Sequence, residues 1–325
     1  AKGKGAVVTD EMRKARQAAK AKRAALSERA AKGKGAVVTE KVPQAQVAPI
    51  TTDLPLAQNK FLDQDGMRAR KFKTARTMFA LMLREMSATY GSSPGGYLWV
   101  VLEPALALAM LSYVFSFFLK TPPFGDSFPL FYATGYLPFV LFIDISNKTA
   151  TSLKFSRQLL QYPAVTFVDA MIARGFLHFL THLSTSYIVF IGMVVILKLN
   201  LTPDYVAVAK GFFIGGVSAF GLGCLNCYVM MTFVAWERIW QILTRPLLFV
   251  SGVLIPFDSM PLFAQDILWW NPIVHVVGYL RKGMYAPMYE GDYLSVLYPV
   301  FFGLLLMAFG LLFLLRNNQK LLEGL

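Results

Sequence analysis

The amino-acid sequence predicts an all-α polytopic membrane protein with six transmembrane helices, an N-terminal amphipathic interface helix and short outer re-entrant helices before the last span. Of its 325 residues, 55% are hydrophobic and 16% are charged, whereas a soluble domain carries about 25% charged residues. Apolar stretches recur after position 97, and about 18 or more apolar residues can cross a bilayer as a helix. These observations exclude a soluble, a disordered and a fibrous protein.

The net charge of +13 is concentrated in the first part of the chain. Residues 1–97 hold 19 Lys and Arg against 8 Asp and Glu, and the remainder holds 13 against 11. A basic segment directly before membrane spans is typical of the cytoplasmic side and of contact with anionic lipids. Nucleic acid is the alternative partner for such a segment, but we expect membrane lipids and no nucleic acid.

Residues 1–60 are predicted to form a basic, disordered cytoplasmic tail. The nine-residue string AKGKGAVVT stands at residues 1–9 and again at 31–39. Two copies without an apolar face cannot build a repeat fold, and the lack of an apolar core argues against a cleaved signal peptide. We therefore expect membrane insertion to rely on the later spans.

Residues 61–97 are predicted to hold a basic amphipathic helix and a turn. Apolar side chains recur at helical spacing between basic ones, at Phe72, Ala75, Phe79, Met82 and Met86. Such a helix lies in the inner membrane interface, and the Gly/Pro cluster after it would turn the chain into the first span. A surface that binds a soluble partner is the alternative interpretation.

Residues 98–316 are predicted to form the transmembrane domain. Its six spans are placed at about 98–119, 129–147, 168–197, 205–232, 239–257 and 294–315. Connections assigned to the cytoplasm carry Lys148, Lys154 and Arg157, whereas the first two outer loops are nearly neutral. The positive-inside rule then places both termini, including residues 317–325, in the cytoplasm.

The last outer segment, residues 258–293, has apolar runs too short to cross a membrane. Pro261 and Pro272 are predicted to break it into short helices that dip into the outer leaflet, with Trp269 and Trp270 at the headgroups. The side chains that these helices would bury are Leu262, Phe263, Ile267, Val274 and Val277.

Ionisable residues inside spans are costly, so each is a candidate functional residue. Arg174, His178 and His182 are spaced by four and share one helix face. This face could line the translocation path or bind a lipid phosphate, or its histidines could simply hydrogen-bond to neighbours such as Thr181. Glu103 in the first span is a further candidate.

Two short patterns resemble metal or catalytic motifs but are incomplete. The histidines read H-F-L-T-H, without the Glu of a zinc-protease motif, and Cys224 and Cys227 supply only two ligands. Gly221 and Gly223 beside the cysteines favour helix packing instead. We therefore predict no catalytic residue and no metal site, and two cysteines make no disulfide framework.

Aromatic and basic residues near both ends of the spans suit a path for a sugar polymer. Their rings present apolar faces with polar handles, although aromatic belts occur in most membrane proteins. Arg84, with Arg76 and Lys73, is suited to attract a phosphate or carboxylate at the inner membrane surface. The other candidates are Tyr90, Tyr97 and Trp99 near the inner entrance, and Trp269, Trp270, Tyr279, Arg281 and Lys282 near the outer exit.

Three segments are distinctive when taken in order along the chain. They are RTMFALMLREMSATYGSSPGGYLWVVLEP, SLKFSRQLLQYPAVTFVDAMIARGF and FVSGVLIPFDSMPLFAQDILWWNPIVHVVGYLRKGMY. Together they resemble the start of span one, the connection after span two and the fifth span with its outer helices in the membrane subunits of ABC-2 type exporters, particularly the capsular polysaccharide (KpsM-type) permeases. The resemblance covers about residues 65–325.

The resemblance implies an ATP-driven exporter that moves a lipid-linked capsular polysaccharide across the bacterial inner membrane. It also implies two copies of this chain, two copies of a separate ATP-binding cassette subunit that holds ATP and Mg²⁺, and a periplasmic or outer-membrane export partner. No G-x-x-x-x-G-K-[ST] phosphate loop occurs in the sequence, which agrees with nucleotide chemistry in another polypeptide. We thus expect no cofactor in this chain.

The stretch Leu153–Pro163 between spans two and three is the predicted contact for the ATPase subunit. By similarity it is a coupling helix, and a capped amphipathic loop helix is the alternative. The coupling candidates are Phe155, Arg157, Gln158, Leu159 and Tyr162.

Other functions stay open at this point. An ABC-2 exporter of O-antigen, teichoic acid or small hydrophobic molecules would share these motifs. A membrane-embedded glycosyl or acyl transferase would need clustered acids, but Asp144, Asp169 and Glu237 are isolated in the sequence. A channel would need a filter-like loop or repeated charged rings, and the sequence offers neither.

Overall fold

The structure is a computed structural model that describes residues 73–91, 95–160 and 165–317. The chain divides into two units, residues 1–68 and 69–325, and every described residue belongs to the second. The predicted tail of residues 1–60, Tyr162, and the side chains of Lys73, Tyr90 and Tyr97 lie outside the described part.

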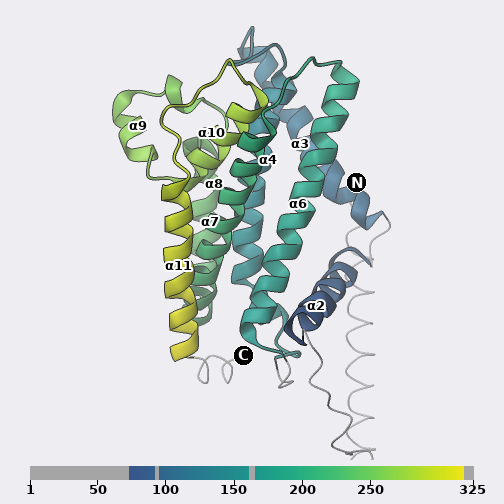
Figure 1. Cartoon of the computed structure of the whole chain (residues 1–325), viewed down its shortest axis with the longest axis vertical. Helices are drawn as coiled ribbons and strands as arrows, with labels where there is room; N and C mark the ends of the chain where they lie inside the picture. Colours follow the sequence, from purple (N-terminus) through teal and green to yellow (C-terminus); the bar gives the residue numbers. More distant parts are fainter. Residues whose placement is uncertain (1–72, 92–94, 161–164, 318–325) are drawn as a thin grey trace, which may run out of the picture. The chain divides into compact units, whose positions relative to one another are not determined.

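Within the described ranges the chain is helical and contains no strand, which confirms the predicted all-α class (Figure 1). The helices are α2 (Lys73–Tyr90), α3 (Gly96–Phe118), α4 (Phe128–Ala150), α5 (Ser152–Phe155), α6 (Phe167–Leu197), α7 (Tyr205–Thr232), α8 (Trp236–Val250), α9 (Leu262–Leu268), α10 (Pro272–Met284) and α11 (Leu297–Arg316), with a short 3₁₀ turn at Phe257–Ser259.

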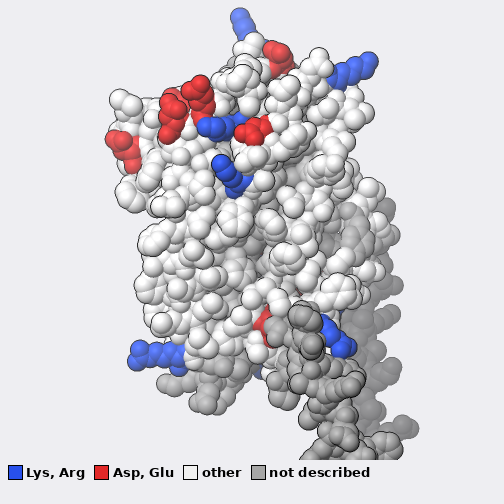
Figure 2. All heavy atoms as spheres, viewed as in Figure 1, with Lys and Arg blue, Asp and Glu red and all other residues white. Residues whose placement is uncertain are grey.

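Five helices, α3, α4, α6, α7 and α11, are long and apolar enough to cross a membrane. They coincide with five of the six predicted spans. In Figure 2 the charged side chains of the visible face lie toward its two ends, with a band of uncharged surface between them. This is the distribution expected of a chain whose middle lies in hydrocarbon.

The segment predicted as a fifth span, residues 239–257, differs from a single spanning helix. Its helix α8 has 15 residues and ends at Val250, so it rises about 22 Å, less than the roughly 30 Å of a hydrocarbon core. The helix stops where Gly252 adopts a left-handed conformation, with φ of 75°, which a helix cannot continue through.

The core of the bundle lies around α4 and α7. In their apolar windows 67% and 56% of residues are buried, against 11% in α3.

Helix α7 packs closely against α11, because Gly221 and Gly303 face each other and a Cβ at Gly221 would collide with the Gly303 carbonyl. Small residues allow two helix backbones to approach closely in membranes. Cys224 and Cys227 of α7 are free thiols that are buried in an apolar cluster. The packing interpretation of the cysteines is confirmed.

Helices α9 and α10 lie at one end of the bundle and α2 at the other (Figure 1). Pro261 and Pro272 begin α9 and α10 rather than interrupt a helix, which is the position where a missing N–H costs least. Within the protein, Val274 and Val277 of α10 are buried, whereas Leu262, Phe263 and Ile267 of α9 are exposed. The insertion of these helices into the outer leaflet stays a prediction.

The predicted coupling helix is much shorter than expected. Helix α5 spans four residues, and residues 156–160 continue as turns. Helix α6 then begins with a capping box, in which the Thr166 hydroxyl accepts from the Asp169 N–H and the Asp169 carboxylate accepts from the Thr166 N–H, both at 3.1 Å. This cap fixes where the chain re-enters the bundle.

Candidate functional site

A row of charged and polar side chains crosses the bundle at the end where α2 and α5 lie. It is formed by Glu85 of α2, Asp144 of α4, and Arg174, His178 and His182 of α6. The i, i+4 spacing on α6 places its three members on one face, as the sequence predicts. That face is directed at α2 and α4, which supply the acids.

Arg174 and Glu85 form a buried ion pair. The Nε of Arg174 lies 3.0 Å from Oε1 of Glu85, and the two side chains are only 10% and 6% exposed. Arg174 also donates from Nη1 to the Thr151 carbonyl at 3.1 Å. Since an unpaired buried charge is strongly unfavourable, each partner is needed to keep the other inside, and the pair fixes α2 against α6.

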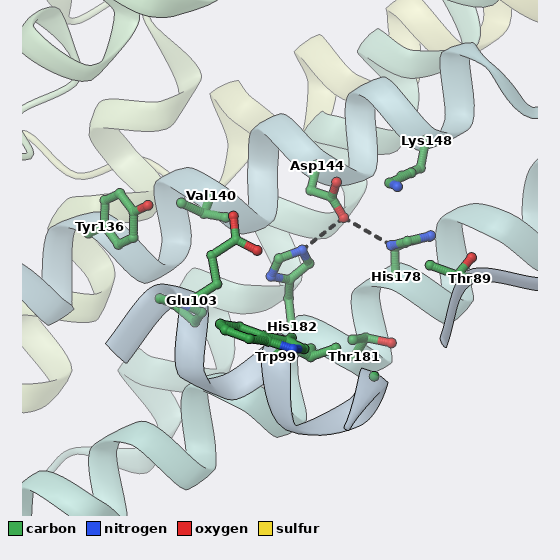
Figure 3. Close-up of a pocket in the computed structure, with 13 residues that line it drawn as sticks. Thr89, Trp99, Glu103, Tyr136, Val140, Asp144, Lys148, His178, Thr181 and His182 are labelled. Carbon is green, nitrogen blue, oxygen red and sulfur yellow. Dashed lines mark hydrogen bonds and ion pairs between the residues drawn. The ribbon is translucent and has the colours of Figure 1, made fainter. Parts of the chain in front are cut away.

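Both histidines of α6 bind the same oxygen of Asp144 (Figure 3). Nδ1 of His178 and Nε2 of His182 each lie 2.9 Å from Oδ2. A carboxylate can only accept, so the imidazoles donate from these nitrogens. His178 also joins the two halves of the row, because its Nε2 lies 3.9 Å from Oε1 of Glu85.

A pocket of about 420 Å³ opens beside this row. Its volume lies within the range of small-molecule sites. In Figure 3, Trp99 and Glu103 of α3 lie beside His182, whose ring is directed toward Asp144. The lining residues are Thr89, Gly96, Trp99, Val100, Glu103, Pro104, Tyr136, Val140, Asp144, Lys148, His178, Thr181 and His182.

The pocket is rich in hydrogen-bond donors and acceptors. Among the described residues no group of three His, Cys, Asp or Glu side chains is arranged to hold a metal ion. Pro104 interrupts the hydrogen bonding of α3 and leaves the carbonyl of Val100 without its intrahelical partner. The arrangement can bind a polar ligand through many hydrogen bonds.

Helix α5 touches the row through one aromatic ring. The guanidinium of Arg174 lies 4.2 Å from the ring centroid of Phe155, and that of Arg84 lies 5.6 Å from it. Phe155, Arg157 and Gln158 are exposed, and Leu159 is half-buried. The predicted ATPase contact and the predicted substrate-path residues are therefore neighbours in space.

Two of the outer candidates, Trp269 and Trp270, belong to a separate aromatic cluster. Trp269 donates from Nε1 to the Tyr293 carbonyl at 3.0 Å and stacks on Tyr298 with centroids 5.1 Å apart, whereas Trp270 is 65% exposed. The protonation of His275 in this cluster is fixed by its neighbours, since Ser295 N–H donates to Nδ1 at 3.2 Å and Nε2 lies 2.9 Å from the Trp269 carbonyl. Burial lowers the pKa of His275 below its ordinary value.

Arg281, a predicted outer path residue, is fully buried instead. Its Nη2 donates to the Val253 carbonyl at 2.8 Å, and its guanidinium lies 4.6 Å from the Phe131 ring centroid. The last turn of α10 faces inward against α4 and thus draws this cation under the surface. Its neighbour Lys282 is half-exposed.

Two members of the row were absent from the residues predicted as candidates. Asp144 is isolated in the sequence, although an aspartate inside a span is itself a signal of function. Glu85 is the single acid in α2, and an acid on a basic amphipathic helix is a comparable departure from pattern. Neither signal identifies the partner, because Asp144 and His182 are 38 positions apart.

Comparison with known proteins supports the predicted resemblance. The family profile described as "ABC-2 type transporter" matches residues 76–285. The polysialic acid transport protein KpsM of Escherichia coli is 28% identical over 248 residues, which cover 76% of this chain and 96% of that protein. The capsule polysaccharide export inner-membrane protein BexB of Haemophilus influenzae is 28% identical over 267 residues, covering 80% and 98%.

A third relative extends the same pattern. The capsule polysaccharide export inner-membrane protein CtrC of Neisseria meningitidis serogroup A is 24% identical over 248 residues, covering 75% of this chain and 92% of that protein. The matched profile spans α2 to α10 and includes the whole charged row and the pocket. This chain belongs to the ABC-2 type transporter family.

Proposed function

We propose that this chain is the membrane-spanning permease subunit of an ATP-driven exporter that moves a lipid-linked capsule polysaccharide across the bacterial inner membrane. The observation that carries the proposal is the similarity to one polysialic acid transport protein and two capsule polysaccharide export proteins over 92% to 98% of their own lengths. The five apolar spans and the polar pocket support a transport role. The chain itself is not expected to be an enzyme.

Energy would come from an ATP-binding cassette partner, which an ABC-2 permease requires. We infer a complex of two permease and two ATPase subunits, with ATP and Mg²⁺ held by the ATPase. The exposed side chains of Phe155, Arg157 and Gln158 on and after α5 are suited to contact that partner. Tyr162, outside the described residues, is assigned to the same contact, as is the half-buried Leu159.

The charged row offers a physical link from this contact to the pocket. A displacement of α5 would move Phe155, whose ring lies against Arg174, and Arg174 holds Glu85. His178 connects this pair to Asp144 on the pocket wall. Because these groups are buried and paired, they favour discrete arrangements over gradual deformation.

We infer six membrane crossings with both termini in the cytoplasm. Helix α8 begins beside α5, where Lys154 Nζ lies 2.8 Å from Glu237 Oε2. It ends beside α10, where the Asn271 side-chain amide donates to the Val250 carbonyl at 3.3 Å. Helix α8 with the turn after it therefore runs between the two ends of the bundle.

We also propose a tail at 1–60, an interface segment at 61–97, a transmembrane domain at 98–316 and a C-terminus at 317–325.

The substrate route would start at the α2 end. Arg76 and Arg84 are exposed on α2 and can attract the anionic part of a lipid-linked glycan. A periplasmic or outer-membrane partner would receive the polymer at the α9 and α10 end, where Trp270 and Lys282 are accessible.

The first experiment is purification of the full chain from its native membrane in mild detergent, with identification of co-purifying proteins. We expect a stoichiometric subunit with a phosphate-binding loop and ATPase activity. Phe155→Ala combined with Arg157→Glu should reduce recovery of that subunit, whereas Ser116→Ala, an exposed change on α3, should not. An intact, folded preparation without any ATPase subunit would contradict the proposed function.

A further inference from the structure

We propose that the 420 Å³ pocket between α2, α3, α4 and α6 binds a sugar ring of the exported polymer through its hydroxyl groups, and excludes the phosphate that links the glycan to lipid. This inference rests on the proposed function and adds to it a site and a part of the substrate. The pocket has the volume of a ligand site and lies at the end of the bundle where α2 and α5 meet.

Three strong hydrogen-bond acceptors are available in the pocket. Glu103 and Asp144 present carboxylates, and Asp144 keeps 28% of its side chain exposed although it holds both histidines. The Val100 carbonyl, released from the helix by Pro104, is a third acceptor. Sugar hydroxyls are donors, and a hydroxyl bound to a carboxylate makes one of the stronger hydrogen bonds.

An aromatic platform lies beside these acceptors. Trp99 is 54% exposed and lines the pocket next to Glu103, one helical turn further along α3. Its large flat face suits the apolar C–H face of a sugar ring, while Tyr136 across the pocket adds a hydroxyl that can donate or accept. A stacking face combined with carboxylates distinguishes this site from a plain aromatic belt.

The charge distribution disfavours a phosphate. Lys148 is the one lysine or arginine among the lining residues, opposed by two carboxylates. Arg174 is directed away to Glu85 and Thr151. The histidine N–H groups that donate to Asp144 are occupied. A phosphate would therefore meet two carboxylates against one ammonium group, which favours sugar binding over the lipid-phosphate alternative for the α6 face.

The test measures binding to the permease purified with its ATPase partner in lipid nanodiscs. The probe is a radiolabelled, lipid-free oligosaccharide cut from the cell's own surface polysaccharide, with inorganic phosphate and glycerol phosphate as competitors. Trp99→Leu should weaken oligosaccharide binding about 3- to 10-fold. Glu103→Gln should weaken it about 10-fold or more.

Matched controls change the same chemistry outside the pocket. Phe117→Leu removes an exposed ring from α3, and Glu290→Gln removes an exposed carboxylate from an outer loop; both should bind the probe like the parent protein. Phosphate and glycerol phosphate should not compete.

The proposal is overturned if the parent protein does not bind the oligosaccharide, or if Trp99→Leu and Glu103→Gln bind it unchanged. Competition by glycerol phosphate that disappears in Lys148→Met would identify an anion site instead. Recovery of the ATPase subunit is scored in the same preparations. A present, active ATPase with no pocket binding refutes this inference alone, whereas its absence refutes the exporter itself.

Discussion

Removal of Arg174 isolates a buried negative charge. In the Arg174→Met variant the side chain keeps much of its length and its apolar contacts, but Glu85 loses the guanidinium 3.0 Å away. Glu85 is only 6% exposed, so water cannot replace that partner without moving α2 away from α6. We expect α2 to detach or Glu85 to take up a proton.

The magnitude follows from the burial of both partners. Breaking a buried ion pair by removing one side costs about 3–5 kcal/mol, and the lost contact with the Phe155 ring adds about 0.5–2 kcal/mol. Replacing both partners by apolar groups of similar size is often neutral. The double variant Glu85→Met with Arg174→Met should therefore be more stable than Arg174→Met alone by at least about 2 kcal/mol.

The assay is unfolding by SDS in mixed micelles, followed by tryptophan fluorescence. The four proteins of the double-mutant cycle are compared by their free energies of unfolding. ATPase stimulation in the assembled complex is measured in parallel, because the double variant should recover stability without recovering the link between α5 and the pocket.

Two results would refute this reasoning. If Arg174→Met changes the free energy of unfolding by less than about 1 kcal/mol, the pair is not buried as the structure places it. If the double variant is as unstable as the sum of the single variants, Arg174 and Glu85 do not depend on each other.

Three further predictions concern packing, pH and coupling. Gly221→Ala should destabilise the protein by about 1–3 kcal/mol, because the added methyl group meets the Gly303 carbonyl. Gly192→Ala should instead stabilise α6 by about 0.5–1 kcal/mol, because its methyl group meets no atom within 4 Å. Thermal unfolding of the two variants distinguishes these outcomes. Because burial lowers the pKa of His275, the unfolded chain binds a proton at a higher pH than the folded chain, and stability should fall as pH drops below about 6.5. His275→Gln should flatten this pH dependence in thermal melts. An unchanged slope would exclude His275 as the source of the pH dependence. Phe155→Leu should retain the ATPase subunit on purification but lower transport per ATP hydrolysed, since the ring against Arg174 is lost; unchanged coupling would show that the ring transmits nothing.

Much of the fold could be predicted because apolar length and helical spacing are local properties. The i, i+4 pattern placed Arg174, His178 and His182 on one face, and the structure confirms that they share it. Their acidic partners come from α2 and α4, and only tertiary packing brings them there. The spacing of residues along the sequence does not reveal such long-range pairs, and Asp144 therefore looks isolated in the sequence.

The local sequence pattern does not predict where one helix ends or how deeply one side chain is buried. The segment at 239–257 is mostly apolar, yet its helix ends at Val250 before the left-handed Gly252. Arg281 follows short apolar runs that predict a surface position, but the inward face of α10 buries it beside Phe131. Both outcomes depend on how neighbouring helices pack, which residue type alone does not specify.

The shallow packing of α3 has a consequence for the range of polymers that one pocket can accept. Only 11% of its apolar window is buried by the rest of the described chain, while Trp99 and Glu103 on this helix form one wall of the pocket. Sideways movement of such a helix in a bilayer exchanges one apolar neighbour for another at little cost, and the left-handed Gly95 at its start provides a joint. The pocket thus has one side set by the packed helices α4 and α6, and one side set by a helix with few neighbours in the described chain, so a shift of α3 would change the pocket's width without disturbing the core.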